Sequence, residues 1–216
     1  MIRSDFLHLG LVSGLLLVAG CSCRPRPALP PFNTAMAAQA AIETYDADGN
    51  GKLDAAELAR CPALLIALPR ADTDGDGALS ADEIAAHIAR WVDSGATLMD
   101  ADVLVTLDGQ PLAGAEVVFE PEEFLRPYFI GAWGVTGETG RVPMTALDAT
   151  REGEGVRVGA YRVLISKAAD GREILPARYN TASQLGVEVA GDVPDLPTHL
   201  EFHLKSHGTS ITRSSP

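Results

Sequence analysis

A phrase of twelve residues that occurs twice is the feature that most constrains what this chain can fold into. The first copy, DADGNGKLDAAE, spans residues 46–57, and the second, DTDGDGALSADE, spans residues 72–83. Each copy places oxygen-bearing side chains at positions 1, 3, 5, 9 and 12 and a glycine at position 6, and four of the five side chains are carboxylates. Their mutual repulsion would loosen the segment unless a cation were bound. The repeat therefore predicts two similar cation-binding loops.

The spacing of these oxygens matches the calcium loop of an EF hand. Such a loop binds Ca²⁺ through positions 1, 3, 5, 7 (by a backbone carbonyl), 9 (often through water) and 12, and glycine at position 6 permits the sharp turn. Mg²⁺ fits less well, because it demands a tighter octahedron and keeps its waters. The predicted ligands of the first Ca²⁺ are Asp46, Asp48, Asn50, Lys52, Asp54 and Glu57. The predicted ligands of the second Ca²⁺ are Asp72, Asp74, Asp76, Ala78, Ser80 and Glu83.

The segment around the loops favours calcium as a structural staple over calcium as a signal. Leu53 and Leu79, at position 8 of each loop, predict a short antiparallel bridge between the loops. The helix entering the second loop is expected to lie between Pro62 and Pro69, which leaves barely two turns. A sensor swings longer helices apart to expose a methionine-rich groove, and this region has one methionine, Met36. Dockerin modules also pair calcium loops, but they normally close the loop with aspartate rather than glutamate.

The N-terminal segment predicts export and a lipid anchor. Residues 7–20 form an apolar run of 14 residues, shorter than the roughly 20 that a membrane-spanning helix needs. The run ends in LVAGC, residues 17–21, which resembles a bacterial lipobox. That resemblance implies a signal peptide over residues 1–20, acylation of Cys21 and attachment to a membrane of the bacterial cell envelope. A plain signal peptide and a buried apolar helix are the alternatives.

Residues 21–33 are rich in proline and are expected to form an extended tether. Two further cysteines, Cys23 and Cys61, lie in and beyond this segment. Disulfides persist in exported proteins, so a Cys23–Cys61 bridge and two unpaired thiols both remain open.

A helical region is predicted over residues 34–95, followed by a β-sandwich over residues 98–205 and a flexible tail over residues 206–216. The first helix is expected to begin at Asn33 or Thr34, with an apolar stripe at Ala35, Ala38, Ile42 and Tyr45. After residue 98, apolar and polar residues alternate around the hairpin signal DGQP. Further strands are expected at 132–136, 141–147, 159–167, 185–189 and 200–204. The predicted fold class is therefore α+β in separate domains, a small all-α EF-hand pair followed by an all-β sandwich of about seven strands.

Four segments of the second half resemble the carboxypeptidase regulatory-like (transthyretin-like) sandwich domain. They are VTLDGQPLAGAEVVFEP (105–121), GAYRVLISK (159–167), LPARYNTASQLGVEV (175–189) and LEFHLKS (200–206). The domain is common in small lipoproteins of bacteria, notably planctomycetes, and the resemblance implies a non-catalytic module of seven strands. One turn, GVTGETGRVPM, departs from the family pattern because Val142 occupies an aromatic position.

The composition and the absence of certain motifs argue against several classes of function. The net charge of −12 argues against nucleic-acid binding, which needs a basic surface. The sequence contains no G-x-S-x-G, no phosphate-binding G-x-x-x-x-G-K-[ST] and no H-E-x-x-H, so we expect no enzyme activity. We therefore expect a calcium-binding envelope protein with an interaction or spacer module.

Two alternative functions remain open, each resting on a group of side chains. A glycan-binding or adhesion patch would use Tyr128, Phe129 and Trp133, with an envelope protein or a glycan as partner. A hydrolase or metalloenzyme would use the C-terminal histidines His199, His203 and His207. Strand alternation there turns Leu200, Phe202 and Leu204 inward and the first two histidines outward, which disfavours a metal site. His87 is expected on a helix surface.

Overall fold

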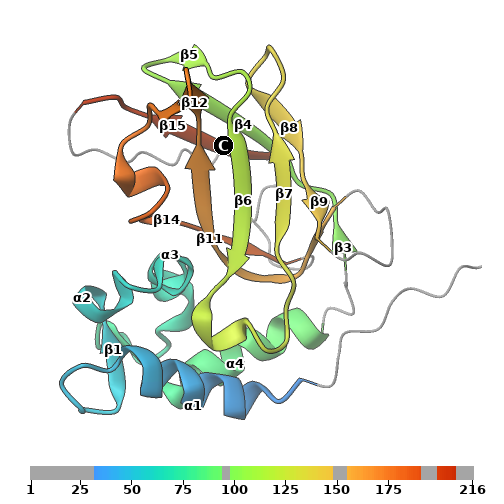
Figure 1. Ribbon diagram of the computed structural model, residues 1–216. Helices are drawn as coiled ribbons and strands as arrows, with labels where there is room; N and C mark the ends of the chain where they lie inside the picture. The colour runs from blue at the N-terminus through green and yellow to red at the C-terminus, as the bar shows by residue number, and fades with distance from the viewer. Residues whose placement is uncertain (1–31, 94–97, 148–154, 191–198, 208–216) are drawn as a thin grey trace, which may run out of the picture.

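The structure is a computed structural model that describes residues 32–93, 98–147, 155–190 and 199–207. A helical region at the bottom of Figure 1 is followed in the chain by a β-sandwich above it, which confirms the predicted fold class. Cys21, Cys23, most of the tether and the end of the tail lie outside the described residues. Within the described residues, none of the helices combines the length and the apolar character that crossing a membrane requires.

The helical region consists of four helices and two short strands. They are α1 (Thr34–Tyr45), β1 (Lys52–Asp54), α2 (Ala55–Leu58), α3 (Pro62–Ala71), β2 (Ala78–Ser80) and α4 (Ala81–Asp93). Helix α1 begins where predicted, because the Asn33 side chain accepts a hydrogen bond of 3.0 Å from the Met36 N–H. Ala35 belongs to the predicted apolar stripe but is exposed, whereas the buried residues of α1 are Ala37, Ala38, Ala41, Ile42 and Tyr45.

Helix α3 continues through Pro69, so the prediction that this proline ends the helix is wrong. Pro69 lacks the N–H that would bond one turn back. The helix nevertheless closes beyond it, because the Asp72 N–H donates to the Leu68 carbonyl at 2.9 Å. The helix that enters the second loop therefore has ten residues.

The strands of the β region are β3 (Leu98–Met99), β4 (Asp102–Leu107), β5 (Gln110–Pro111), β6 (Glu116–Pro121), β7 (Ala132–Val135), β8 (Arg141–Pro143), β9 (Thr145–Ala146), β10 (Val156–Arg157), β11 (Gly159–Ser166), β12 (Ala168–Ala169), β13 (Arg172–Glu173), β14 (Leu185–Val189) and β15 (His199–Leu204). Strand β3 pairs with β10 and β12 pairs with β13, and the other strands form two main sheets. One sheet has five strands in the order β14-β11-β6-β7-β9. The other has four, with β4 between β15 and β5 and β8 also paired to β4. The strands in both sheets pair antiparallel except β15 and β4, which are parallel.

The segment predicted as one strand over 141–147 is two strands in different sheets. Strand β8 pairs with β4, placing Val142 opposite Val103, whereas β9 pairs with β7, placing Thr145 opposite Trp133. Between them the Met144 side chain is buried in the core. The chain therefore crosses from one sheet to the other at this point, and the sandwich contains more strands than the predicted seven.

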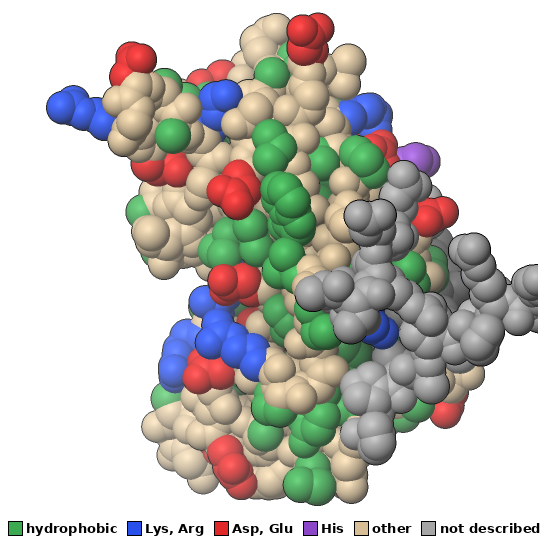
Figure 2. All heavy atoms as spheres, turned by 45° about the vertical axis from the view of Figure 1, so that its right-hand side comes forward, with side chains coloured by type: hydrophobic (Ala, Val, Ile, Leu, Met, Phe, Trp, Pro, Cys, Tyr) green, Lys and Arg blue, Asp and Glu red, His purple; other side chains and the backbone are tan. Residues whose placement is uncertain are grey.

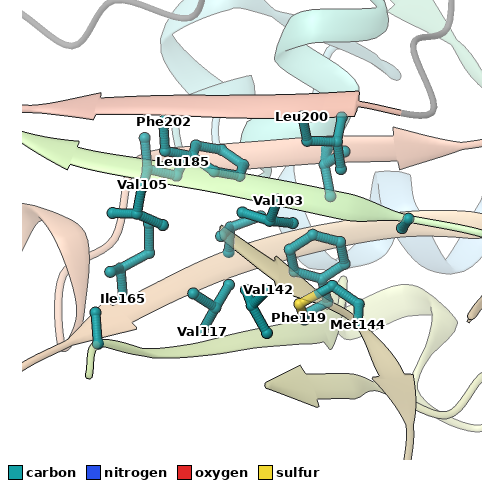
Figure 3. Packing of buried hydrophobic residues seen from close by; sticks show 14 of the residues in the cluster. Val103, Val105, Val117, Phe119, Val142, Met144, Ile165, Leu185, Leu200 and Phe202 are labelled. Atoms are coloured by element: carbon teal, nitrogen blue, oxygen red, sulfur yellow. The ribbon is translucent and has the colours of Figure 1, made fainter. Parts of the chain in front are cut away.

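The sandwich core lies between the two sheets. Figure 3 shows side chains from both sheets meeting there, among them Val103, Val117, Phe119 and Phe202. Alternation along β11 and β15 turns their apolar side chains inward as predicted; these are Tyr161, Val163, Ile165, Leu200, Phe202 and Leu204.

The helical region and the sandwich share a second hydrophobic core. Six buried residues of the β region pack among the helices; they are Phe124, Leu125, Phe129, Val158, Ala160 and Ala190. Helix α3 lies against β14 and β11. A Cβ on Gly186 would be 2.4 Å from the Pro62 carbonyl carbon, so the approach of α3 to β14 depends on this glycine. The two regions therefore meet through close backbone packing.

Candidate metal centre

The two calcium loops are joined by the predicted antiparallel bridge. Strands β1 and β2 pair with Leu53 opposite Leu79 and Lys52 opposite Ser80. Both leucine side chains are fully buried. One ladder and one buried pair of side chains therefore hold the two loops together.

The first loop is built around the Asp46 carboxylate. Its oxygens accept hydrogen bonds from the N–H groups of Gly51 at 2.9 Å, Gly49 at 2.8 Å and Asn50 at 3.2 Å. These bonds, the Gly51 bond above all, lower the pKa of Asp46. Gly49 and Gly51 take φ values of 76° and 81°, which glycine adopts without strain. Loop shape and the charge of its first ligand therefore depend on each other.

Glu57 closes the first loop at position 12. One of its oxygens accepts from the Ala47 N–H at 2.7 Å and the other from the Asp54 N–H at 3.0 Å. Carboxylate oxygens of Asp46, Asp48 and Glu57 lie within 4.8 Å of one another, a spacing that a single cation can bridge. Asp54 is the N-cap of α2 and accepts from the Glu57 N–H, which suits its predicted action through water.

The second loop repeats this construction. The Asp72 carboxylate accepts from the Gly75 N–H at 2.7 Å and the Gly77 N–H at 2.9 Å. Carboxylate oxygens of Asp72, Asp74 and Asp76 lie within 4.8 Å of one another. The loop therefore presents the ligands of positions 1, 3 and 5 as one group.

Glu83 closes the second loop with more support than Glu57 has. Its oxygens accept from the Thr73 and Ser80 N–H groups at 2.8 and 2.9 Å and from the hydroxyls of the same two residues at 3.0 and 2.8 Å. Desolvation raises the pKa of Glu83, but these hydrogen bonds outweigh it and lower the pKa to about 2. The carboxylate is therefore ionised at neutral pH, as a calcium ligand must be.

The donor set of both loops fits Ca²⁺. It consists of carboxylate, amide, hydroxyl and backbone carbonyl oxygens, which a hard cation prefers, and contains no sulfur or imidazole. Lys52 and Ala78 at position 7 would contribute their backbone carbonyls, and Asn50 its amide oxygen.

The structure does not form the aromatic patch suggested by the sequence. Phe129 is buried in the core shared with the helices, and Phe32 packs edge-on against both Phe129 and Tyr128. Trp133 is 43% exposed on β7, beside Val135. Figure 2 shows hydrophobic side chains gathered on one face of the sandwich. Burial of Phe129 leaves too few exposed rings for the predicted three-residue patch.

The C-terminal histidines do not form a metal site among the described residues. His199 and His203 face outward from β15, as alternation predicts. His203 Nδ1 lies 2.9 Å from the Thr106 hydroxyl, and His199 Nδ1 lies 3.6 Å from Asp102. In the described part of the chain, the groups of His, Cys, Asp and Glu side chains close enough to hold a metal lie in the two calcium loops.

His87 is buried, so its predicted place on a helix surface is wrong. It is 2% exposed, and its Nε2 lies 2.7 Å from Oε1 of Glu188, which is also 2% exposed. Glu188 was not recognised from the sequence. The available signal in the sequence was a carboxylate within the otherwise uncharged segment LGVEV. In the structure this segment is a strand in which every residue is buried.

Cys61 is a free thiol in the structure and is fully buried beside α3. Its proposed partner Cys23 lies outside the described residues. Burial raises the pKa of the Cys61 thiol well above its ordinary value, so the group behaves as a small apolar side chain.

Comparison with protein families supports the calcium loops. The EF hand family matches residues 38–62 and 68–88, which include both loops and most of the flanking helices. A search of curated proteins finds no match to this chain. A search of solved structures finds none either. The match to the EF hand, together with the two acidic groups, supports calcium binding by the helical region.

Proposed function

We propose that this protein is a lipid-anchored calcium-binding protein of the bacterial cell envelope, in which two bound ions act as a structural staple. The β-sandwich would serve as a non-catalytic interaction or spacer module. One observation carries the structural role of calcium: α3, the helix that leads into the second loop, is held on the sandwich at both of its ends by buried carboxylates.

At the N-terminal end of α3 the carboxylate belongs to Glu122. This side chain is 1% exposed and accepts a hydrogen bond of 3.0 Å from the Ala63 N–H, in the first turn of the helix. Next to it, the Arg162 guanidinium donates to the Arg60 carbonyl at 2.5 Å and lies 3.8 Å from Glu122. Basic and acidic side chains are visible at the level where the two regions meet in Figure 2. The start of α3 is therefore fixed by polar contacts to the sandwich.

At the C-terminal end of α3 the carboxylate belongs to Glu188. It accepts from the Arg70 guanidinium at 2.5 Å and from the Trp91 indole N–H at 2.5 Å, and His87 Nε2 lies 2.7 Å away. Arg70 is on α3, whereas His87 and Trp91 are on α4. One carboxylate of the sandwich thus holds the two helices that flank the second loop.

This arrangement opposes the motion that a calcium sensor makes. A sensor exposes a groove by swinging the helices around a loop apart. Here such a swing would separate Arg70 from His87 and Trp91, so the buried Glu188 carboxylate would lose the donors of one helix or the other, which costs several kcal/mol. Calcium binding is therefore expected to add stability without opening the helix pair.

The staple is tested by calcium titration of the purified protein with three readouts. Calorimetry counts the bound ions, circular dichroism follows thermal unfolding, and an apolar dye reports newly exposed surface. We expect two ions, a large rise in melting temperature and little new dye binding. Strong dye binding on addition of calcium would contradict the staple and indicate a sensor.

The lipid anchor is proposed from the LVAGC segment and needs its own test. In cells fed a labelled fatty acid, the protein should carry the label and sediment with membranes. Cys21→Ala should abolish both, whereas Cys23→Ala should leave both unchanged. Equal labelling of the Cys21→Ala variant would refute the anchor and leave the calcium proposal untouched.

A further inference from the structure

The Lys52 side chain extends from the first loop into the second. Lys52 stands at position 7 of the first loop, where calcium uses the backbone carbonyl, so the side chain is not needed there. Its partner in the β1–β2 ladder is Ser80, which belongs to the second loop. The ammonium lies 3.3 Å from Oδ2 of Asp74 and contacts Oδ2 of Asp76 more closely. A cation of the first loop thus contacts the position 3 and position 5 ligands of the second.

The arrangement is not reciprocal. The second loop carries Ala78 at position 7, opposite Asp54 in the ladder, and alanine has no charge to place among the carboxylates of the first loop. The second loop also has one more carboxylate among positions 1, 3 and 5 than the first, which carries Asn50 at position 5. Lys52 therefore offsets charge in the loop where acidic side chains are most concentrated.

We propose that Lys52 is an internal counter-ion of the second loop that competes with Ca²⁺ and thereby weakens calcium binding at that loop. This inference rests on the proposed calcium binding. For Asp74 and Asp76 to bind an ion, the ammonium must first leave them, and its charge then repels the ion from the adjoining strand. Binding at the first loop is spared, because its ligand from Lys52 is a backbone carbonyl.

The same contact stabilises the second loop when calcium is absent. Asp72, Asp74 and Asp76 repel one another, and a neighbouring ammonium relieves that repulsion. Since Lys52 is partly exposed and both aspartates are exposed, the stabilisation is that of a surface ion pair and depends on salt. Removing the charge should therefore weaken the calcium-free protein and tighten calcium binding at the second loop.

The test separates the loops by inactivating one at a time. In the Glu57→Gln background the remaining site is the second loop, and there Lys52→Met should tighten calcium binding by roughly three- to tenfold at low salt. In the Glu83→Gln background, where the first loop remains, Lys52→Met should leave affinity unchanged. Lys52→Arg is the matched control, since it keeps the charge, and it should reproduce the wild-type affinities in both backgrounds. Chelator competition measures all of these affinities.

A second readout needs no calcium. In chelator, Lys52→Met should lower the melting temperature by about 1–3 °C, and Lys52→Arg should not. The inference is overturned if Lys52→Met leaves second-loop affinity unchanged or weakens it, or if Lys52→Arg has the same effect as Lys52→Met. Absence of calcium binding in the wild-type protein would overturn the proposed function as well. Binding that is insensitive to Lys52→Met would overturn this inference alone.

Discussion

The negative charge of the carboxylates in the calcium loops and that of the carboxylates at the interface with the sandwich are compensated in different ways. Asp72, Asp74 and Asp76 are clustered, partly or fully exposed and close to one another. Glu122 and Glu188 are buried, stand apart and each accept hydrogen bonds from other groups of the chain, Glu122 from the Ala63 N–H and Glu188 from Arg70 and Trp91. The loops therefore need a cation from outside to complete them, whereas the interface is complete without one. We therefore expect bound calcium to stabilise the loops, and the interface to hold the stabilised helices on the sandwich.

The largest expected effect is loss of the bound ions. Glu57→Gln and Glu83→Gln should each remove one ion, and the double variant should bind none tightly. A neutral amide cannot supply two anionic oxygens, and its NH₂ group would face the Ala47 or Asp54 N–H where Glu57 accepts. Calorimetric stoichiometry checks this. Two ions bound by the double variant would refute the assignment of these glutamates as ligands.

Removing the carboxylate of Glu188 should cost the most stability. Glu188→Ala leaves the Arg70, Trp91 and His87 groups without their shared acceptor, and breaking a buried ion pair from one side costs about 3–5 kcal/mol. Urea unfolding measures this loss. Glu116→Ala is the matched control, because Glu116 is an exposed glutamate on β6 of the same sheet, and it should change stability by less than about 0.5 kcal/mol. Equal losses in the two variants would contradict the role given to Glu188.

The loops could be predicted from the sequence, and the interface could not, for a physical reason. Every ligand role in a calcium loop depends on spacing within twelve residues, so Asp46 and Glu57 are recognisable without knowledge of the fold. Glu188 lies 97 residues from Trp91 and 118 from Arg70 along the chain, and no local pattern connects them. The assignment of His87 to a helix surface failed for the same reason, because its partner is on a strand of the other region.

Local rules also failed where tertiary contacts overrode them. Pro69 was expected to end α3, yet the helix continues past it along β14. The segment 141–147 has the alternation of one strand, but Met144 turns into the core and the two flanking pieces join different sheets. In contrast, the alternation of β11 and β15 was predicted correctly, since both strands keep one face on the same core.

The two interface carboxylates should respond to pH in opposite directions. Burial raises the pKa of Glu122 from 4.5 to about 7. Desolvation also acts on Glu188, but its bonds with His87, Trp91 and Arg70 outweigh it and lower its pKa. The folded state therefore binds a proton at Glu122 more tightly than the unfolded state does, and at Glu188 less tightly. Stability from Glu122 is fully present below pH 4.5 and is lost as the pH rises through 7, whereas stability from Glu188 is lost as the pH falls below 4.5.

Glu122→Gln should make the folding stability less dependent on pH near neutral pH. The amide oxygen can still accept from the Ala63 N–H, but the side chain no longer titrates. The rise in the pKa of Glu122 from 4.5 to about 7 corresponds to a loss of at most about 3 kcal/mol of folding stability between pH 5 and pH 8. The variant should match the wild type at pH 5 and be more stable at pH 8. Urea unfolding at four pH values in this range provides the measurement, and parallel profiles for the two proteins would rule out Glu122 as the titrating group.

The smallest expected effect lies outside both sets of carboxylates. Asn33→Ala removes the N-cap of α1 and should cost about 1 kcal/mol, or roughly 2–4 °C in melting temperature. Asn33→Ser keeps a capping oxygen and should retain most of the stability. Neither variant should alter calcium affinity, because Asn33 touches no loop ligand and the interface carboxylates keep their donors. If Asn33→Ala also weakened calcium binding, the start of α1 would have to be coupled to the first loop through the helix itself. Calcium would then stabilise the helical region along its length and not only at its loops.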